Sequence, residues 1–148
     1  MVDGTEHLFA SAMERRLTLR LLAYWEKIRS GRIMPSESDF KADDIAEFWE
    51  SCFLLHPARF NDVSYCHSHL GSQLAAAGKN EAELLISPQN PDVLPIYTVL
   101  MADFKPITSE GEITSQTGKL VQFRRCFLPL GHNDTVTAIV GGLRFKVF

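Results

Sequence analysis

Apolar residues recur every three or four positions over the first thirty residues of the chain. The members of this stripe are Phe9, Met13, Leu17, Leu21, Tyr24, Trp25 and Ile28. This spacing places them on one face of an α-helix. Gly31 suits the left-handed residue that ends a helix, and Pro35 prevents its continuation. We therefore predict an N-terminal helix within residues 1–31, whose stripe must pack on the rest of the chain or on a second subunit.

The middle of the chain carries short elements separated by turn residues. In order, the pattern predicts a helix near 43–49, a buried strand over 52–55, an alternating strand over 60–70, a helix over 71–77, a loop over 81–92 and a helix over 93–104. His56-Pro57 ends the first strand, and Pro95 is confined to the first turn of the last helix. Gly78 and Pro88 are the main breaks between these helices.

The last third alternates as strands. We predict strands over 107–114, 120–130 and 136–147, joined by turns at 115–118 and 131–134. The final two strands are apolar on both faces, so the sheet must be covered on both sides. We expect the mid-chain helices on one face and the N-terminal helix on the other. Consecutive strands joined by Gly/Asn/Asp turns predict an α+β fold with an antiparallel sheet.

Several segments, in order and spacing, resemble a family of small bacterial stand-alone PAS-like proteins. The segments are residues 22–25, Gly31-Arg32, Met34-Pro35-Ser36, residues 53–55, residues 65–72, residues 127–130 and residues 139–143, within a resemblance that covers about 17–145. The resemblance implies a five-stranded antiparallel sheet with helices over a ligand-sized cavity on one face. It also implies a long N-terminal helix serving as a cap or dimer contact, and signalling without an attached output domain. Glu50, His56-Pro57, His67 and His69 depart from the family pattern.

Composition fits one soluble domain, with residues 1–31 as the helix and residues 32–148 as a PAS-like core. The chain has 148 residues, of which 45% are hydrophobic and 22% charged. A net charge of -3 and no long basic run argue against nucleic-acid binding. We predict no membrane span and no secretory signal. Cys52, Cys66 and Cys126 are widely spaced, which argues for a reducing, cytoplasmic location.

Candidate ligand contacts fall on two strands. Tyr65, His67 and His69 would share one face of the strand over 60–70 and line a polar pocket wall. No further ligands have metal-site spacing, so we predict no metal. Arg125 lies in register with Phe123 and could clamp a carboxylate or phosphate. The alternatives are hydrogen-bonded rim histidines and an arginine that reaches the sheet edge or pairs with an acid.

Other conspicuous residues have plain explanations. Tyr24 and Trp25 could form a helix-dimer patch or pack in the core. Cys126 does not match the Asn-Cys-Arg motif of light-sensing flavin PAS domains, so we predict a core cysteine. Gly141-Gly142 lies in a strand, which is the wrong context for a phosphate-binding loop. We find no catalytic constellation in the sequence and no cofactor signature.

These observations favour a non-enzymatic PAS-type sensory module. We expect it to bind a small-molecule ligand or a signalling protein partner, to be a homodimer, and to act through a shift in the packing of its N-terminal helix. The alternative is a small cone-shaped α+β isomerase or dehydratase that uses His67 or His69 as its base. A buried acid paired with a histidine in a deep pocket would favour that enzyme. A third reading is a structural interaction module with a filled core.

Overall fold

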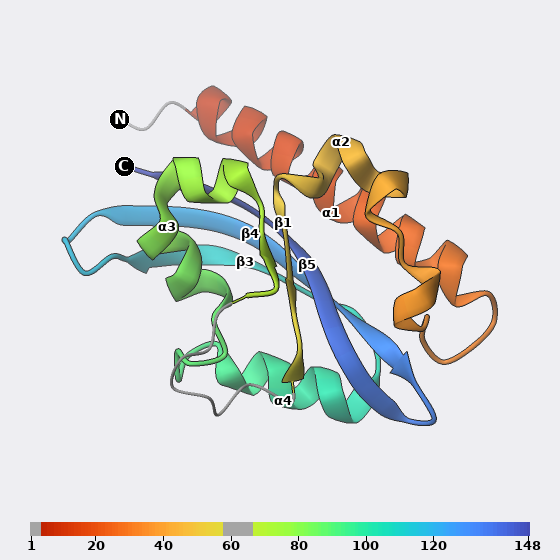
Figure 1. Cartoon of the computed structure of the whole chain (residues 1–148). Coiled ribbons are helices and arrows are strands. Elements are labelled where there is room, and N and C mark those ends of the chain that lie inside the picture. The colour runs from red at the N-terminus through yellow and green to blue at the C-terminus, as the bar shows by residue number, and fades with distance from the viewer. Residues whose placement is uncertain (1–3, 58–66) are drawn as a thin grey trace.

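The computed structural model describes residues 4–57 and 67–148, with side chains from residue 15 onward (Figure 1). Its elements are α1 (Gly4–Arg29), the 3-10 turns η1 (Glu37–Asp39) and η2 (Ala42–Ile45), α2 (Ala46–Trp49), β1 (Cys52–Leu55), β2 (His69–Leu70), α3 (Ser72–Ile86), α4 (Leu94–Asp103), β3 (Ile107–Thr114), β4 (Leu120–His132) and β5 (Thr135–Val147). Within the described part of the chain, no helix is both long enough and apolar enough to cross a bilayer.

One antiparallel sheet organises the chain, with strand order β2-β1-β5-β4-β3. The longest pairing joins β4 to β5 through a two-residue turn, Asn133 and Asp134, at φ 53° and 59°. Positive φ at both central residues defines the tight turn that matches strand twist. The predicted turn was two residues too long: the strands continue to His132, across a bulge between Leu130 and Gly131.

The N-terminal helix α1 covers one face of the sheet (Figure 1). It contacts the sheet through Leu17, Leu21 and Trp25, all buried. The approach is close at Gly142, where an added Cβ would lie 2.5 Å from the Leu21 side chain. A strand residue without a side chain therefore makes room for the helix. The predicted packing of the stripe on its own sheet is confirmed for these three members, while the side chains of Phe9 and Met13 lie outside the described part of the chain.

The opposite face lies under α3 and α4 (Figure 1). Three fully buried rings meet there: Phe127 lies 5.7 Å from Phe53 and 5.2 Å from Tyr97, centroid to centroid, both pairs edge-on. The Tyr97 hydroxyl donates to the carbonyl of Ile86. At these residues the space between helices and sheet is filled by side chains. The predicted α+β class, a five-stranded antiparallel sheet with flanking helices and a long N-terminal helix, is confirmed.

The loop predicted over 81–92 is wrong in its first half. Helix α3 continues through Gly78, whose φ of 150° makes a kink, and ends only at Ile86. Ala82, Leu85 and Ile86 belong to this second half of the helix and are buried. Their burial stabilises helix where the local break at Gly78 disfavours it. The strand predicted over 60–70 is described only at β2, and the rest of that prediction lies outside the described residues.

Candidate functional site

His67 lies on the face of the sheet that α3 and α4 cover, against α3. Its side chain is 2% exposed, and its Nδ1 atom lies 3.6 Å from Oε1 of Glu83. Its ring meets Phe53 edge-on with centroids 6.0 Å apart. The interaction with His67 is the main cause that holds the pKa of Glu83 below its ordinary value, with Lys79 adding to the effect. A buried imidazole is therefore joined to a half-exposed carboxylate.

His69 does not share that environment, so the expectation that the two histidines face one site is wrong. Its ring stacks on Trp49 at 4.0 Å and 3°, and its Nε2 lies 3.1 Å from the Trp49 carbonyl. Ser68 between them forms a bend, and strict two-residue alternation holds only in extended strand. His69 thus packs beside α2 while His67 faces α3. Tyr65, predicted to join them, lies outside the described residues.

Arg125 is held between β3, β4 and the end of α3. Its Nε donates to Ser109 Oγ at 2.8 Å, and its Nη1 donates to the carbonyl of Leu85. The guanidinium lies over the Phe123 ring at 4.5 Å. Leu85 is in the last turn of α3, where carbonyls lack helical partners and favour a cation. Burial lowers the pKa of Arg125. The structure therefore holds this arginine through neutral acceptors and a ring contact, and no acidic side chain within the described ranges forms an ion pair with it.

Tyr24 and Trp25, the aromatic pair of α1, contact other segments of the same chain. The Trp25 indole N–H donates to the Pro129 carbonyl at 2.8 Å, and the ring is buried. The Tyr24 hydroxyl donates to Asp44 Oδ2 at 2.8 Å, accepts from the Lys41 N–H, and its ring meets Phe40 edge-on. Both rings thus connect α1 to its own sheet and to the segment that follows it. Of the two roles considered for Tyr24 and Trp25, a helix-dimer patch or packing in the core, these contacts correspond to packing.

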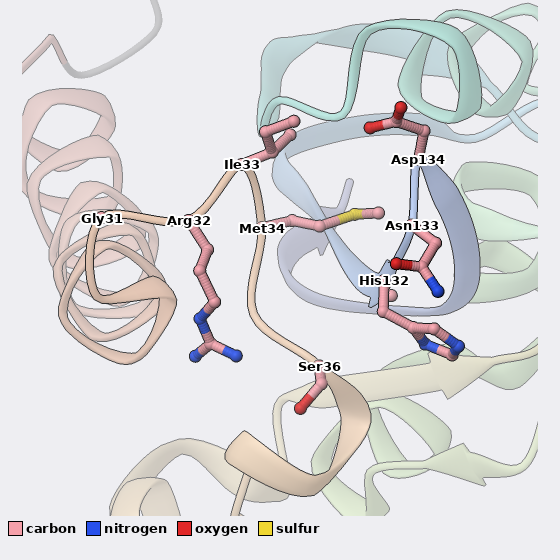
Figure 2. Close-up of a pocket in the computed structure, with 9 residues that line it drawn as sticks. Gly31, Arg32, Ile33, Met34, Ser36, His132, Asn133 and Asp134 are labelled. Atoms are coloured by element: carbon pink, nitrogen blue, oxygen red, sulfur yellow. The ribbon is translucent and has the colours of Figure 1, made fainter.

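A hollow of about 570 Å³, lined by both polar and apolar residues, lies where the exit of α1 meets the tip of the β4–β5 hairpin (Figure 2). The loop after α1 contributes Arg32, Met34 and Ser36, and the hairpin contributes His132 and Asp134. The size suits a small molecule. Arg32 already binds the carbonyl of Ile28 and the carboxylate of Asp39. Any molecule seated there would contact the helix exit and the hairpin together.

The two described cysteines are inert core residues. Cys52 and Cys126 each pair with Gly142, from opposite sides, so two strand spacings separate them. Burial raises the pKa of Cys126 to about 12 and raises that of Cys52 as well. Thiols of this kind are not nucleophiles. Across residues 4–57 and 67–148, no group of three or more His, Cys, Asp or Glu side chains is placed to hold a metal ion.

The pairing of Glu83 with His67 predicts an acid-dependent loss of stability. The folded pKa of Glu83 is lowered from 4.5, so the pairing stabilises the fold above that pH and is lost as the pH falls through the folded pKa. We expect His67→Gln to lower the free energy of unfolding near neutral pH, and the difference from wild type to shrink under acid. Urea unfolding at neutral pH and below about pH 4 measures this. The exposed-carboxylate control Glu47→Gln should show no such convergence, and parallel curves for His67→Gln would contradict the pairing.

The structure contains a five-stranded antiparallel sheet, helices over one face and a long leading helix, as the sequence resemblance implied. The fold is PAS-like. Three solved structures are similar to it at low identity. The first is the N-terminal domain of a diguanylate cyclase with PAS/PAC sensor from Marinobacter aquaeolei (12% identity, covering 63% of this chain and 91% of that chain, TM-score 0.45). The second is an RNA-binding light-oxygen-voltage receptor (15% identity, covering 64% of this chain and 28% of that chain, TM-score 0.41). The third is the ligand-binding domain of a Pseudomonas aeruginosa amino-acid chemoreceptor in complex with GABA (14% identity, covering 97% of this chain and 61% of that chain, TM-score 0.33).

No family model matches the chain, and no curated protein matches its sequence. With TM-scores below 0.5, the likenesses to solved structures add no weight to the topology described above. The strand order and the two helical layers define the fold.

Proposed function

We propose that this chain is a PAS-type sensory and signalling module that binds a small ligand or a protein partner. The observation that carries the proposal is the position of α1. It lies across one face of the sheet, while the candidate ligand contacts His67 and Arg125 lie on the other face. A module built this way has an input layer and an output layer that share the same strands.

Strands β4 and β5 connect the two layers directly. In β4, Arg125 and Phe127 face α3 and α4, whereas Pro129 offers its carbonyl to Trp25 of α1. In β5, Gly142 lies against Leu21 of α1. A ligand that moves the guanidinium or the aromatic rings would thus alter strands that α1 contacts. The signal is a change in population between two packings of α1 on the sheet.

We propose His67 and Arg125 as the ligand contacts on the face covered by α3 and α4, with Tyr65 as a further candidate. His69 is assigned to packing because it stacks on Trp49. Two of the Arg125 nitrogens donate to Ser109 and Leu85, so an anionic group would be met by the remaining N–H groups of the fork. We also propose that the protein is a cytoplasmic homodimer.

Native mass spectrometry of the purified protein, followed by hydrogen exchange, tests this function. We expect a dimer mass, and a retained or added ligand that changes amide exchange in α1. As the defined probe, citrate or inorganic phosphate should raise the melting temperature of the wild type more than that of Arg125→Gln. An equal shift in both proteins would remove Arg125 from the ligand contacts. Unchanged exchange in α1 with any bound ligand would contradict the signalling mechanism.

One observation favours the alternative, a small enzyme with a histidine base. His67 is buried and paired with Glu83, which also lines a shallow polar hollow of about 320 Å³ together with Asn80 and Gln116. A carboxylate can orient an imidazole for proton transfer. A ligand released from the native protein and returned to it should stay chemically unchanged if the protein is a receptor. Conversion that stops in His67→Gln would support the enzyme.

A further inference from the structure

Three polar side chains from distant parts of the chain form a hydrogen-bonded row at the end of β1. His56 lies in the middle: its Nδ1 is 2.7 Å from Oγ of Ser68, and its Nε2 is 3.1 Å from Oε1 of Glu37. Glu37 belongs to η1, His56 follows β1, and Ser68 precedes β2. This row of Ser68, His56 and Glu37 is separate from His67 and from Arg125, and the proposed function does not use it.

The charge on Glu37 decides which nitrogen of His56 carries a proton. A hydrogen bond with Thr137, and then the proximity of His56 and His132, hold the pKa of Glu37 below its ordinary value. The ionised carboxylate can only accept, so it selects the His56 tautomer with a proton on Nε2. Nδ1 then keeps its lone pair and accepts from the Ser68 hydroxyl. The carboxylate thus orients the imidazole, and the imidazole is placed to remove the serine proton.

Ser68 is both anchored and accessible. Its backbone N–H donates to the Leu54 carbonyl at 2.8 Å, which fixes the main chain beside β1. Ser68 is an exposed residue, and His56 is half-buried with 35% of its side chain exposed. An approaching reagent can therefore reach Oγ without displacing the histidine.

We propose that Ser68 is an activated nucleophile that accepts acyl groups from activated esters or thioesters. In the first step, Oγ bonds to the acyl carbon as its proton passes to Nδ1 of His56. The bond from that carbon to the leaving group breaks, and the leaving group departs with the proton from His56. Water then regenerates Ser68 by the reverse route, releasing the carboxylic acid. Glu37 is a positioning residue that acts through His56.

The direct test is treatment of the full chain with 4-nitrophenyl acetate and, separately, with a fluorophosphonate, followed by peptide mass spectrometry. We expect one added group on the peptide containing Ser68. Ser68→Ala should lose this labelling. Ser38→Ala is the matched control, because Ser38 is an exposed serine that pairs with Ser36 and no histidine; its labelling should equal that of the wild type. Mapping of the wild type alone settles the site if Ser68→Ala fails to fold.

The rates separate activation from mere exposure. His56→Gln, which retains hydrogen-bonding groups, should slow acylation on the order of 10²-fold, the usual contribution of a general base. Glu37→Gln should slow it by a smaller factor, and Glu37→Asp should recover part of the loss. Absence of label on Ser68, equal labelling of Ser38, or an unchanged rate in His56→Gln would each overturn the proposal. None of these outcomes bears on α1 or Arg125, so the proposed sensory function is tested independently.

Discussion

Trp25→Ala is expected to destabilise the protein by about 3–5 kcal/mol, the range for removal of a large buried aromatic side chain. The indole fills the space between α1 and β4, and its N–H is the partner of the Pro129 carbonyl. The variant therefore leaves both a cavity and an unsatisfied acceptor. For a chain of this size, the melting temperature should fall by roughly 6–20 °C.

Leu19→Ala is the matched control on the same helix. Leu19 is 57% exposed, so its removal should change stability by no more than about 0.5 kcal/mol. Hydrogen exchange adds a local readout: the amides of α1 should lose protection in Trp25→Ala before those of β4 and β5 do. If both variants melt alike, α1 does not rest on the sheet through Trp25, and the output layer of the proposed module loses its anchor.

Phe127→Ala is expected to cost a similar amount, about 3–5 kcal/mol, on the opposite face. The ring is fully buried and contacts both Phe53 and Tyr97 edge-on. Such aromatic pairs add stabilisation beyond the area that they bury. Urea unfolding measures the loss. Leu120→Ala, on the same strand and 40% exposed, should stay near the wild-type value.

The cavity left by Phe127→Ala provides a second measurement. An apolar cavity in a core stays dry and can bind benzene, so benzene should raise the melting temperature of Phe127→Ala and leave the wild type unchanged. A rise in the wild type would mean that the layer beneath α3 and α4 already holds open space. That outcome would move the ligand of the proposed module into the core instead of to its rim.

The two variants separate the layers on which signalling depends. Trp25 of α1 packs on one face of the sheet. Phe127 lies on the opposite face, which holds the candidate ligand contacts. Because β4 carries Phe127 and the Pro129 carbonyl only two residues apart, a disturbance on one face should reach the other. Increased exchange of α1 amides in Phe127→Ala, beyond the overall loss of stability, is the result that the proposed mechanism requires.

The elements themselves could be predicted from the sequence because they depend on local periodicity. The α1 stripe, the strand over 52–55 and the two-sided apolar pattern of β4 and β5 each report which positions avoid water. Two-sided burial also required a helical layer on each face of the sheet, which the structure has. Here each residue's environment is set by neighbours a few positions away or by the sheet as a whole.

Only the tertiary structure decided the partners of the polar side chains. Arg125 meets the Leu85 carbonyl, His67 and His69 part at the Ser68 bend, and α3 continues past Gly78 because later residues are buried. The row of Glu37, His56 and Ser68 joins residues 19 and 12 positions apart with no motif between them. Apolar burial is non-directional and leaves a periodic mark in the sequence. A hydrogen bond needs one particular group at one distance and angle, and folding alone brings that group into place.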